Sequence, residues 1–495
     1  MRQYILAIDQ GTTGSTALIL NGELEIVGTS SNDFPQHFPQ PAWVEHDLNE
    51  VWQSVCLAAA GAIKEAGIDP GEIAGIGLTN QRETTCAWDL NGLPLARAIV
   101  WQDRRTASEC VKLKGKRLEK FISHRTGLLI DPYFSATKMA WMKKYVPTVR
   151  DGLKTGTIRF GTIDSFLLYR LTGGRHATDV TNASRTMMMN LASCNWDDDL
   201  LDLFGIPRAV LPEILPTAVE YGRTRGFLNV PDGTPITGIA GDQHAALFGQ
   251  ACFGKGDAKC TYGTGAFALL NTGTEPIFSK NRMLTTVAWK LGSKTTYCLE
   301  GSAFIAGAAV QWVRDGLGII ESSPAIEPLA ASVPDSDGVT FVPALSGMGA
   351  PHWLAEARGL ITGITRRTSR AHIARATLEG VAFQVAELIA AMGKDFGKRI
   401  SSLKVDGGAA SNDLLMQFQS DILATKIVRS SIQETTAFGA GLQAGLGCGL
   451  WKDLDEISAR WKNRGEFHPK ISTARRRVEL KRWNRAVCAV RLLSQ

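Results

Sequence analysis

The first thirty residues alternate between apolar runs and short polar turns. Residues 4–8 and 17–20 are apolar, and a turn rich in glycine and hydroxyl groups separates them. The Asn21-Gly22 pair that follows is a strong hairpin signal and predicts a third strand over residues 23–28. The chain therefore begins as an antiparallel sheet and does not enter a helix after its first turn.

Helical spacing follows this sheet. Asp47, with Glu50 three residues later, has the pattern of a capping box, and the apolar residues after it recur on one helix face up to Gly67. An apolar strand at 73–78 comes next and ends in a polar loop. Strands that alternate with helices and end in polar loops are typical of α/β folds, which bind ligands at such strand ends.

The opening hairpin pattern recurs in the middle of the chain. Residues 259–262 lead into the turn Gly263-Thr264-Gly265, and apolar residues resume at 266–270. Thr264 follows Thr12 by about half the chain, which is too long for a solenoid repeat and suits a domain duplication.

The length of the chain supports two domains, because 495 residues exceed the size at which one core keeps growing. We expect domains at 1–248 and 249–495 with a cleft between them. Each would present one threonine-glycine hairpin, and the two hairpins could close on one phosphate chain from opposite sides. Such closure would exclude water from the site.

Composition narrows the function classes. Hydrophobic residues at 44% and charged residues at 21% suit a soluble globular enzyme. The net charge of +6 is mild and the basic residues are dispersed, which argues against a nucleic-acid partner. The nine cysteines lack CxxC spacing and indicate reduced thiols. No apolar run is long enough for a membrane span, so we expect a cytoplasmic protein.

The first hairpin turn has the composition of a phosphate-binding turn. The chain contains no GxxxxGK[ST] motif, so phosphate would be held by turn amides around Gly14 and by the hydroxyls of Thr12, Thr13 and Ser15. Asp9 precedes the turn, and a carboxylate beside phosphate is repulsive unless a divalent cation lies between them. The turn therefore implies Mg²⁺. Taken alone, the same stretch could be an ordinary polar hairpin.

A second group of residues suits a small uncharged polyol. Arg82 and Glu83 follow the strand at 73–78, Trp101 follows another strand, and Tyr133 and Gln243 lie in later polar segments. Arginine donates hydrogen bonds, glutamate accepts them, glutamine does both, and aromatic faces cover a carbon skeleton. The alternative is an exposed Arg-Glu ion pair beside aromatic residues of the core.

Asp242 is the candidate general base. It follows the predicted strand at 235–240 and precedes the helical segment 245–248. In phosphoryl transfer the attacking hydroxyl must lose a proton, and a positioned aspartate can accept it. The alternative is simple capping of the helix N-terminus, a frequent role of aspartate.

Two further glycine-containing segments allow the close approach of a ligand, or of another helix in the case of the first. Gly307 begins a small-residue helix, and the Gly407-Gly408 turn joins a strand to a helix that Asn412 could cap. The Gly407-Gly408 turn could instead simply connect two elements.

These motifs together resemble the FGGY carbohydrate kinase family, and in particular its members that phosphorylate glycerol. The strings that carry the resemblance are DQGTTGS at Asp9, TNQRET at Thr79, VWQDRRT at Val100, PYFSATKMAW at Pro132, TNASRT at Thr181, GIAGDQ at Gly238, TYGTG at Thr261, AGAAVQW at Ala306 and DGGAASN at Asp406. They occur in the order of the family and cover most of the chain.

The resemblance implies an actin/hexokinase-like (ribonuclease H-like) two-domain α/β fold and the transfer of phosphate from ATP to glycerol, giving sn-glycerol 3-phosphate. It implies that Asp242 is the general base and lies with Asp9 near Mg²⁺. The first domain would bind polyol and phosphate, the second the nucleotide. The implied glycerol site is Arg82, Glu83, Trp101, Tyr133, Asp242, Gln243 and Phe267, and the implied nucleotide site is Thr12, Thr13, Gly14, Thr264, Gly307, Gln311, Gly408 and Asn412. We also expect a homo-oligomer, either a dimer or a tetramer.

One departure and two alternatives remain open at this stage. Thr16 stands where the family commonly has an arginine that contacts the nucleotide phosphates, so we expect the affinity for nucleotide to be affected more than the reaction. The acceptor could be another short polyol or a ketopentose. A protein that closes on ATP without transferring phosphate is the alternative outside the enzymes.

Overall fold

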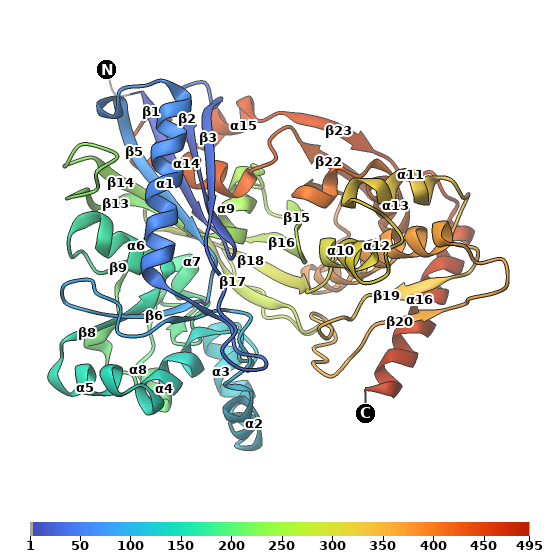
Figure 1. Cartoon of the computed structure of the whole chain (residues 1–495), viewed down its shortest axis with the longest axis horizontal. Coiled ribbons are helices and arrows are strands. Elements are labelled where there is room, and N and C mark those ends of the chain that lie inside the picture. The colour runs from blue at the N-terminus through green and yellow to red at the C-terminus, as the bar shows by residue number, and fades with distance from the viewer. Residues whose placement is uncertain (1–2, 495) are drawn as a thin grey trace.

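The computed structural model describes residues 3–494, which form two lobes, each built on its own mixed β-sheet (Figure 1). In spatial order the first sheet contains β13 (Ala218–Arg223), β14 (Pro235–Gly241), β5 (Ile73–Asn80), β1 (Tyr4–Gln10), β2 (Gly14–Leu20) and β3 (Ile26–Asp33). The second contains β17 (Leu284–Leu291), β18 (Lys294–Ala303), β16 (Ala266–Gly273), β15 (Ala258–Tyr262), β21 (Ser402–Asp406), β22 (Lys426–Ser430) and β23 (Asn463–Phe467).

Smaller sheets and helices complete the lobes. The smaller sheets are β4 (Glu45–His46), β7 (Ala98–Ile99), β6 (Thr85–Asp89) and β8 (Ile158–Thr162) together, β9 (Ala177–Asp179) with β12 (Glu213–Leu215), β10 (Met189–Asn190) with β11 (Asn195–Trp196), and β19 (Thr340–Val342) with β20 (Leu360–Thr362). The α-helices are α1 (Leu48–Ala66), α2 (Ala107–Gly115), α3 (Glu119–Thr126), α4 (Ser135–Tyr145), α5 (Pro147–Thr155), α6 (Ile163–Thr172), α7 (Val180–Ala183), α8 (Asp198–Phe204), α9 (Asp242–Gly249), α10 (Gly307–Asp315), α11 (Ile326–Ala331), α12 (Arg370–Phe396), α13 (Asp413–Leu423), α14 (Thr435–Gly447), α15 (Leu454–Arg460) and α16 (Thr473–Leu493).

The two main sheets repeat one local arrangement. β1 pairs antiparallel with β2 and parallel with β5, and β15 pairs antiparallel with β16 and parallel with β21. In each sheet the hairpin turn therefore lies beside the carboxyl end of the parallel neighbour. Asp9 is opposite Thr79, and Thr261 is opposite Asp406. The repeated sequence pattern corresponds to a repeated structural unit.

Helix α1 begins and ends where the sequence predicts, but its cap differs in one contact. The Asp47 side chain accepts a hydrogen bond from the Asn49 amide, and Gly67 ends the helix with φ of 65°. Glu50 bonds to His37 at 2.9 Å, so it does not complete the predicted capping box. A competing partner on the neighbouring loop accounts for the difference.

One further prediction of local structure was wrong. The third strand was expected at 23–28 but begins at Ile26, because the turn is longer than two residues and Leu24 takes a left-handed conformation with φ of 66°. The polar segment 178–185 contains the end of β9 and the short helix α7. Its N-cap, Asp179, accepts from two backbone amides of that helix.

Helix α14 comes from the second half of the chain but packs on the first sheet and on α9. Glycines permit this close approach. A Cβ at Gly439 would lie 1.8 Å from the Ala245 carbonyl oxygen, and one at Gly77 of β5 would lie 2.3 Å from the Ala440 carbonyl oxygen. The contact fixes α9, the helix that begins with Asp242.

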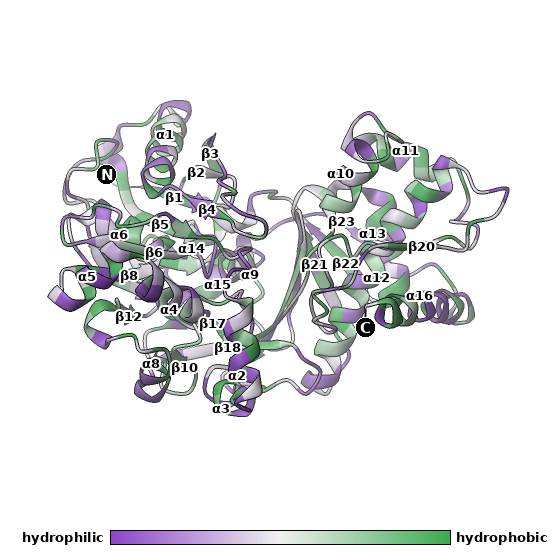
Figure 2. Cartoon of the chain, turned by 60° about the horizontal axis from the view of Figure 1, so that its bottom comes forward, coloured by the Kyte–Doolittle hydropathy of each residue, from purple (hydrophilic) through white to green (hydrophobic). Residues whose placement is uncertain are grey.

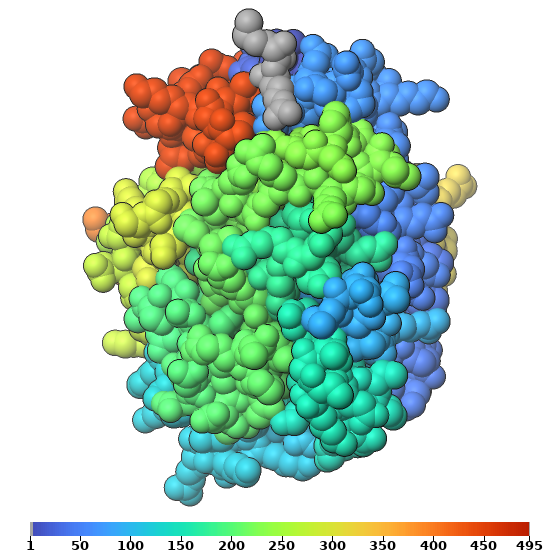
Figure 3. Space-filling view, turned by 90° about the vertical axis from the view of Figure 1, so that its left-hand side faces the viewer, coloured from blue at the N-terminus to red at the C-terminus, as the bar shows by residue number. Residues whose placement is uncertain are grey.

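The segment after α14 also lies against the first lobe. Trp451 donates its indole N–H to the Gly22 carbonyl at 3.0 Å, and its side chain is buried with Ile5 and Leu20 in one apolar cluster. Figure 3 shows this orange-red segment next to the blue N-terminal strands. The chain therefore returns to the first lobe after it has built most of the second.

We expect Gly439→Ala to destabilise the protein by about 1–3 kcal/mol or more, because overpacking forces the α9–α14 contact apart. The free energy of unfolding, measured by urea titration, checks this. Gly115→Ala is the matched control, since it also lies in a helix and a Cβ there meets nothing within 4 Å. Equal stability of the two variants would contradict the role given to this contact.

Apolar residues gather on the sheets and on the helix surfaces that face them, and polar residues lie at the periphery (Figure 2). Helix α12 is long and apolar enough to cross a membrane by length and composition, but 83% of its apolar window is buried inside the protein. Its side chains belong to the main apolar cluster of the second lobe, beside Trp483 and Phe341. Helix α12 is therefore a core helix of the second lobe.

Candidate active site

A cavity of about 400 Å³ lies between the lobes. Its walls combine both threonine-glycine hairpins with the polar and aromatic residues that follow strand ends. The lining residues are Thr12, Thr13, Gln36, Phe38, Arg82, Glu83, Trp101, Gln102, Tyr133, Asp242, Thr264, Gly265, Phe267 and Phe304. Thr12 and Thr264 therefore face the same crevice.

A second cavity of about 310 Å³ lies beside the first, and Thr264 lines both. Gly307, Gln311, Gly408 and Asn412 are among its walls, together with apolar side chains from α10, α11 and α13. Asn412 also caps α13, since its side-chain oxygen accepts from the Leu415 amide at 2.8 Å. Capping and cavity lining thus coincide at this residue.

Three residues of the expected sites line neither cavity. Gly14 begins β2, and a Cβ there would lie 2.5 Å from the Asp33 carboxylate, so its role is to allow the hairpin to pack. Asp9 lies in β1 below the turn. Gln243 is buried, and its amide oxygen accepts from the Lys259 ammonium at 2.5 Å.

Trp101 joins the aromatic wall to the first hairpin. Its indole N–H donates to the Thr12 hydroxyl at 2.9 Å, and its ring meets Tyr133 edge-on with centroids 5.7 Å apart. Phe267 of the second lobe approaches the same indole at 6.4 Å. The three rings form an apolar wall on the cavity, which Phe38 and Phe304 also line.

Asp242 is the first residue of α9, and Gly241 is the N-cap. Its Oδ1 accepts from the Gln243 backbone amide at 2.6 Å and forms an ion pair with Arg82, whose Nε lies 2.8 Å away. The side chain is 29% exposed, so it can reach a ligand in the cavity. The carboxylate is held by its partners yet open to the crevice, which a general base requires.

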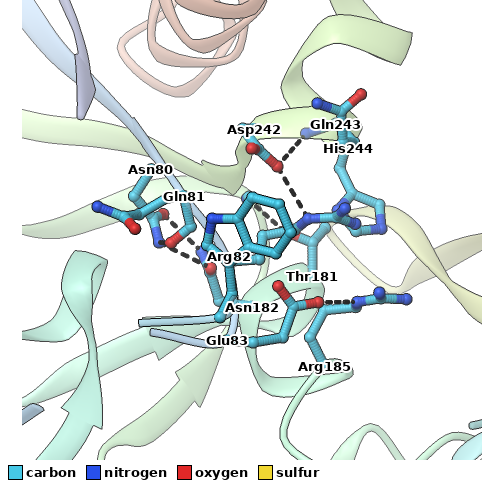
Figure 4. A network of polar contacts seen from close by, with 12 residues as sticks. Asn80, Gln81, Arg82, Glu83, Thr181, Asn182, Arg185, Asp242, Gln243 and His244 are labelled. Atoms are coloured by element: carbon cyan, nitrogen blue, oxygen red, sulfur yellow. Dashed lines mark hydrogen bonds and ion pairs between the residues drawn. The ribbon is translucent and has the colours of Figure 1, made fainter. Parts of the chain in front are cut away.

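Four charged side chains form a buried cluster behind Asp242: Arg82, Glu83, Arg185 and Glu300, each at most 2% exposed. Arg82 donates to the two oxygens of Glu300 at 2.6 and 2.8 Å. Arg185 Nε donates to Glu83 at 2.6 Å (Figure 4). Arg82 and Glu83 are therefore not an exposed ion pair. Each is paired with a residue far away in the sequence.

The pKa directions follow from this pairing. Burial opposes the charge of Glu300, but the guanidiniums of Arg185 and Arg82 outweigh it and hold the pKa of Glu300 well below its usual range. Burial raises the pKa of Glu83 even though the same two arginines lower it. The cluster is stable only as a set, since each buried charge needs its partner.

Short polar contacts fix the strand ends that carry these residues. The Thr181 hydroxyl of α7 accepts from the Gly241 amide at 2.8 Å, and Asn182 exchanges amide hydrogen bonds with Asn80 at 3.1 Å in both directions. Glu83 itself has φ of 62°, a left-handed conformation that is costly for a non-glycine residue.

Asp9 lies near two other carboxylates, those of Asp242 and Glu434. Burial raises the pKa of Asp9, and the nearby carboxylates of Asp242 and Glu434 raise it further. A divalent cation would relieve this repulsion. Among residues 3–494, no three His, Cys, Asp or Glu side chains are grouped closely enough to ligate one metal ion alone.

The sequence motifs did not identify Arg185, Glu300, Lys259 or Glu434 as residues of the site. Arg185 lies in a quoted string, TNASRT, but nothing local marks it as the partner of Glu83. Glu300 carried a usable signal, because a single carboxylate inside the apolar strand β18 must find a buried cation.

Comparison with known proteins shows to which family the chain belongs. The sequence model of the N-terminal domain of the FGGY family of carbohydrate kinases matches residues 4–249, and that of the C-terminal domain matches residues 258–448. The chain belongs to the FGGY family of carbohydrate kinases. The family resemblance drawn from the sequence motifs and the two-domain α/β fold class are confirmed.

Relatives within the FGGY family extend over the whole chain. A glycerol kinase of Myxococcus xanthus is 54% identical over 98% of this chain and 99% of its own, and one of Bdellovibrio bacteriovorus is 53% identical over 98% and 99%. The crystal structure of Plasmodium falciparum glycerol kinase with ADP has a TM-score of 0.91 at 37% identity and covers 98% of both chains. A gluconate kinase from Lactobacillus acidophilus, with a TM-score of 0.88 at 23% identity over 99% and 98%, shares the fold.

Proposed function

We propose that this FGGY kinase transfers the terminal phosphoryl group of ATP to glycerol and forms sn-glycerol 3-phosphate. The observation that carries the proposal is the cavity in which Arg82, Glu83 and Asp242 face an aromatic wall, next to a second cavity that shares Thr264. A three-carbon polyol needs donors and acceptors along one side and an apolar surface along the other. The relatives named glycerol kinase support the same acceptor.

The glycerol site of this proposal consists of residues that touch or adjoin the first cavity. Arg82 donates to hydroxyls, Glu83 accepts from them, and the rings of Trp101, Tyr133 and Phe267 cover the carbon chain. Gln243 would act from behind, because Lys259 holds its amide oxygen. A site built from buried donors and acceptors rejects acceptors that lack a hydroxyl.

Asp242 accepts the proton of the attacking hydroxyl in this proposal. Its Oδ1 is held by Arg82 and by the Gln243 amide, which fixes the carboxylate at the start of α9. A fixed carboxylate both orients the hydroxyl oxygen and removes its proton as the new O–P bond forms. The leaving ADP would occupy the second cavity.

The nucleotide site of this proposal spans both hairpins. Thr12, Thr13 and Gly14 would bind phosphate oxygens through hydroxyls and turn amides, as would Thr264. Gly307, Gln311, Gly408 and Asn412 would contact the nucleoside in the cavity that they line. Thr16 bonds to Ser31 at 2.8 Å, so no cation at this position joins the phosphates.

Magnesium suits the carboxylates of the crevice. Asp9 and Asp242 would hold it, with phosphate oxygens and water as its other ligands, because Mg²⁺ usually keeps several waters and few protein ligands. When bound, the ion neutralises charge on the phosphates. The nearby carboxylates of Asp9, Asp242 and Glu434 support this assignment, since a cation among them relieves their mutual repulsion.

Further proposals concern the whole protein. We assign polyol and phosphate binding to residues 1–248 and nucleotide binding to residues 249–495. A cytoplasmic location agrees with nine cysteines that all remain free thiols. A homo-oligomer, dimer or tetramer, stays a prediction.

A panel of acceptors tests the proposed reaction. With ATP and Mg²⁺, we expect glycerol to give the highest kcat/KM among glycerol, dihydroxyacetone, erythritol and xylulose, because the cavity is small and its polar groups suit hydroxyls. Coupled detection of ADP, with product analysis for phosphorylated acceptor, measures it. A clear preference for xylulose would refute the assignment of Arg82 and Glu83, and ATP hydrolysis without phosphorylated product would refute the transfer itself.

A further inference from the structure

Glu300 reaches from the second lobe into the proposed glycerol site. It lies on β18, where it is opposite Leu269 of β16, so its backbone belongs to the second sheet. Its side chain is 1% exposed and accepts two hydrogen bonds from the Arg82 guanidinium, one on each carboxylate oxygen. Arg185 Nη2 approaches the same carboxylate at 3.3 Å.

These contacts fix the orientation of Arg82. Nη1 and Nη2 donate to Glu300, and Nε lies 2.8 Å from Asp242. Because the guanidinium is planar, contacts on two of its edges set its plane as well as its position. The N–H groups that remain can reach a ligand in the cavity, which Arg82 lines.

Charge gives Glu300 a second effect. Arg82 and Arg185 are both buried, and Glu300 lies between two like charges that would otherwise repel each other. Without that carboxylate, Arg82 would be drawn toward its other anionic neighbours, Glu83 and Asp242. Its N–H groups would then turn away from the polyol.

The same strand leads to the nucleotide cavity. After β18 ends at Ala303, Phe304 lines the first cavity and Gly307 begins α10 on the second. Glu300 thus connects the element that carries the nucleotide site with the residue that would hold glycerol.

We propose that Glu300 is a positioning residue that holds Arg82 for polyol recognition and makes glycerol affinity depend on the second lobe. This inference is built on the proposed function of the site. Glu300 itself touches no substrate; it acts through Arg82.

Steady-state kinetics of Glu300→Gln test the proposal. We expect the KM for glycerol to rise by about 10- to 100-fold, the range for loss of a charged hydrogen bond. We expect a smaller change in kcat and a KM for ATP within about two-fold of the wild type, because the nucleotide cavity is intact. Glu300→Asp keeps the charge and should recover part of the lost glycerol affinity.

Glu379→Gln is the matched control. Glu379 is also a buried glutamate, bonded to Arg375 and near Arg482, but it lines neither cavity. We expect it to alter stability and leave the KM for glycerol unchanged.

The outcomes separate this inference from the proposed function. If the wild-type protein does not phosphorylate glycerol, the proposed function itself is refuted. An active wild type with an unchanged glycerol KM in Glu300→Gln, or with the same rise in Glu379→Gln, overturns only the role of Glu300. If Glu300→Gln does not fold, Glu300→Asp decides: a wild-type glycerol KM in that variant overturns the proposal, and an elevated one supports it.

Discussion

Asp242→Asn should lower kcat by about 100-fold or more, the range for removal of a positioned base. The asparagine oxygen can still accept from the Gln243 backbone amide and can still lie beside Arg82, so the start of α9 should keep its geometry. Only the capacity to take a proton is lost. Rates of ADP formation at saturating glycerol and ATP measure the effect, and isothermal titration with glycerol should show binding within a few fold of the wild type.

Asp453→Asn is the control for this substitution. Asp453 caps α15, accepts from the Glu456 amide at 3.0 Å and is exposed, so the same change of charge occurs at a helix start that lines neither cavity. We expect its kcat to match the wild type. Full turnover in Asp242→Asn would disprove the assignment of the base.

Arg185→Met should lower the free energy of unfolding by about 3–5 kcal/mol, because it leaves the buried Glu83 without its closest cation. The arginine is 0% exposed, and burial already raises the pKa of Glu83. Urea unfolding followed by circular dichroism gives the difference. We expect glycerol binding to weaken as well, since Glu83 would take up a proton more readily and lose its role as an acceptor.

Arg208→Met provides the comparison with an exposed ion pair. Arg208 contacts Asp198 at 2.6 Å, and the two side chains are 45% and 78% exposed. Surface pairs contribute about 0–1 kcal/mol, so its loss should be small. Similar destabilisation by both variants would show that the cluster around Glu83 is not the source of the effect.

Local patterns predicted the elements that position the site. The apolar runs around the first hairpin, the helix between Asp47 and Gly67, and the strand before Arg82 all lie close to their predicted bounds. These signals are local, since turn residues and periodicity depend only on neighbours in the sequence.

Those local signals could not predict ion pairs between residues that are far apart in the sequence. Arg82 meets Glu300 more than two hundred residues later, and Glu83 meets Arg185 about a hundred residues later. The turn before β3 was misjudged for a related reason: Asn21-Gly22 favours a tight turn, but Leu24 and the contact of Asn21 with Glu25 extend it. Tertiary contacts chose among options that the local sequence left open.

The return of α14 to the first sheet has a consequence for how the molecule can be divided. A cut at the midpoint of the chain would strip a helical cover from β1, β5 and β14 and leave their glycine-studded surface in water. The first lobe is therefore complete only with α14, which comes from the last quarter of the polypeptide. Any swing of the lobes must carry α14 along with the half to which it does not belong by sequence.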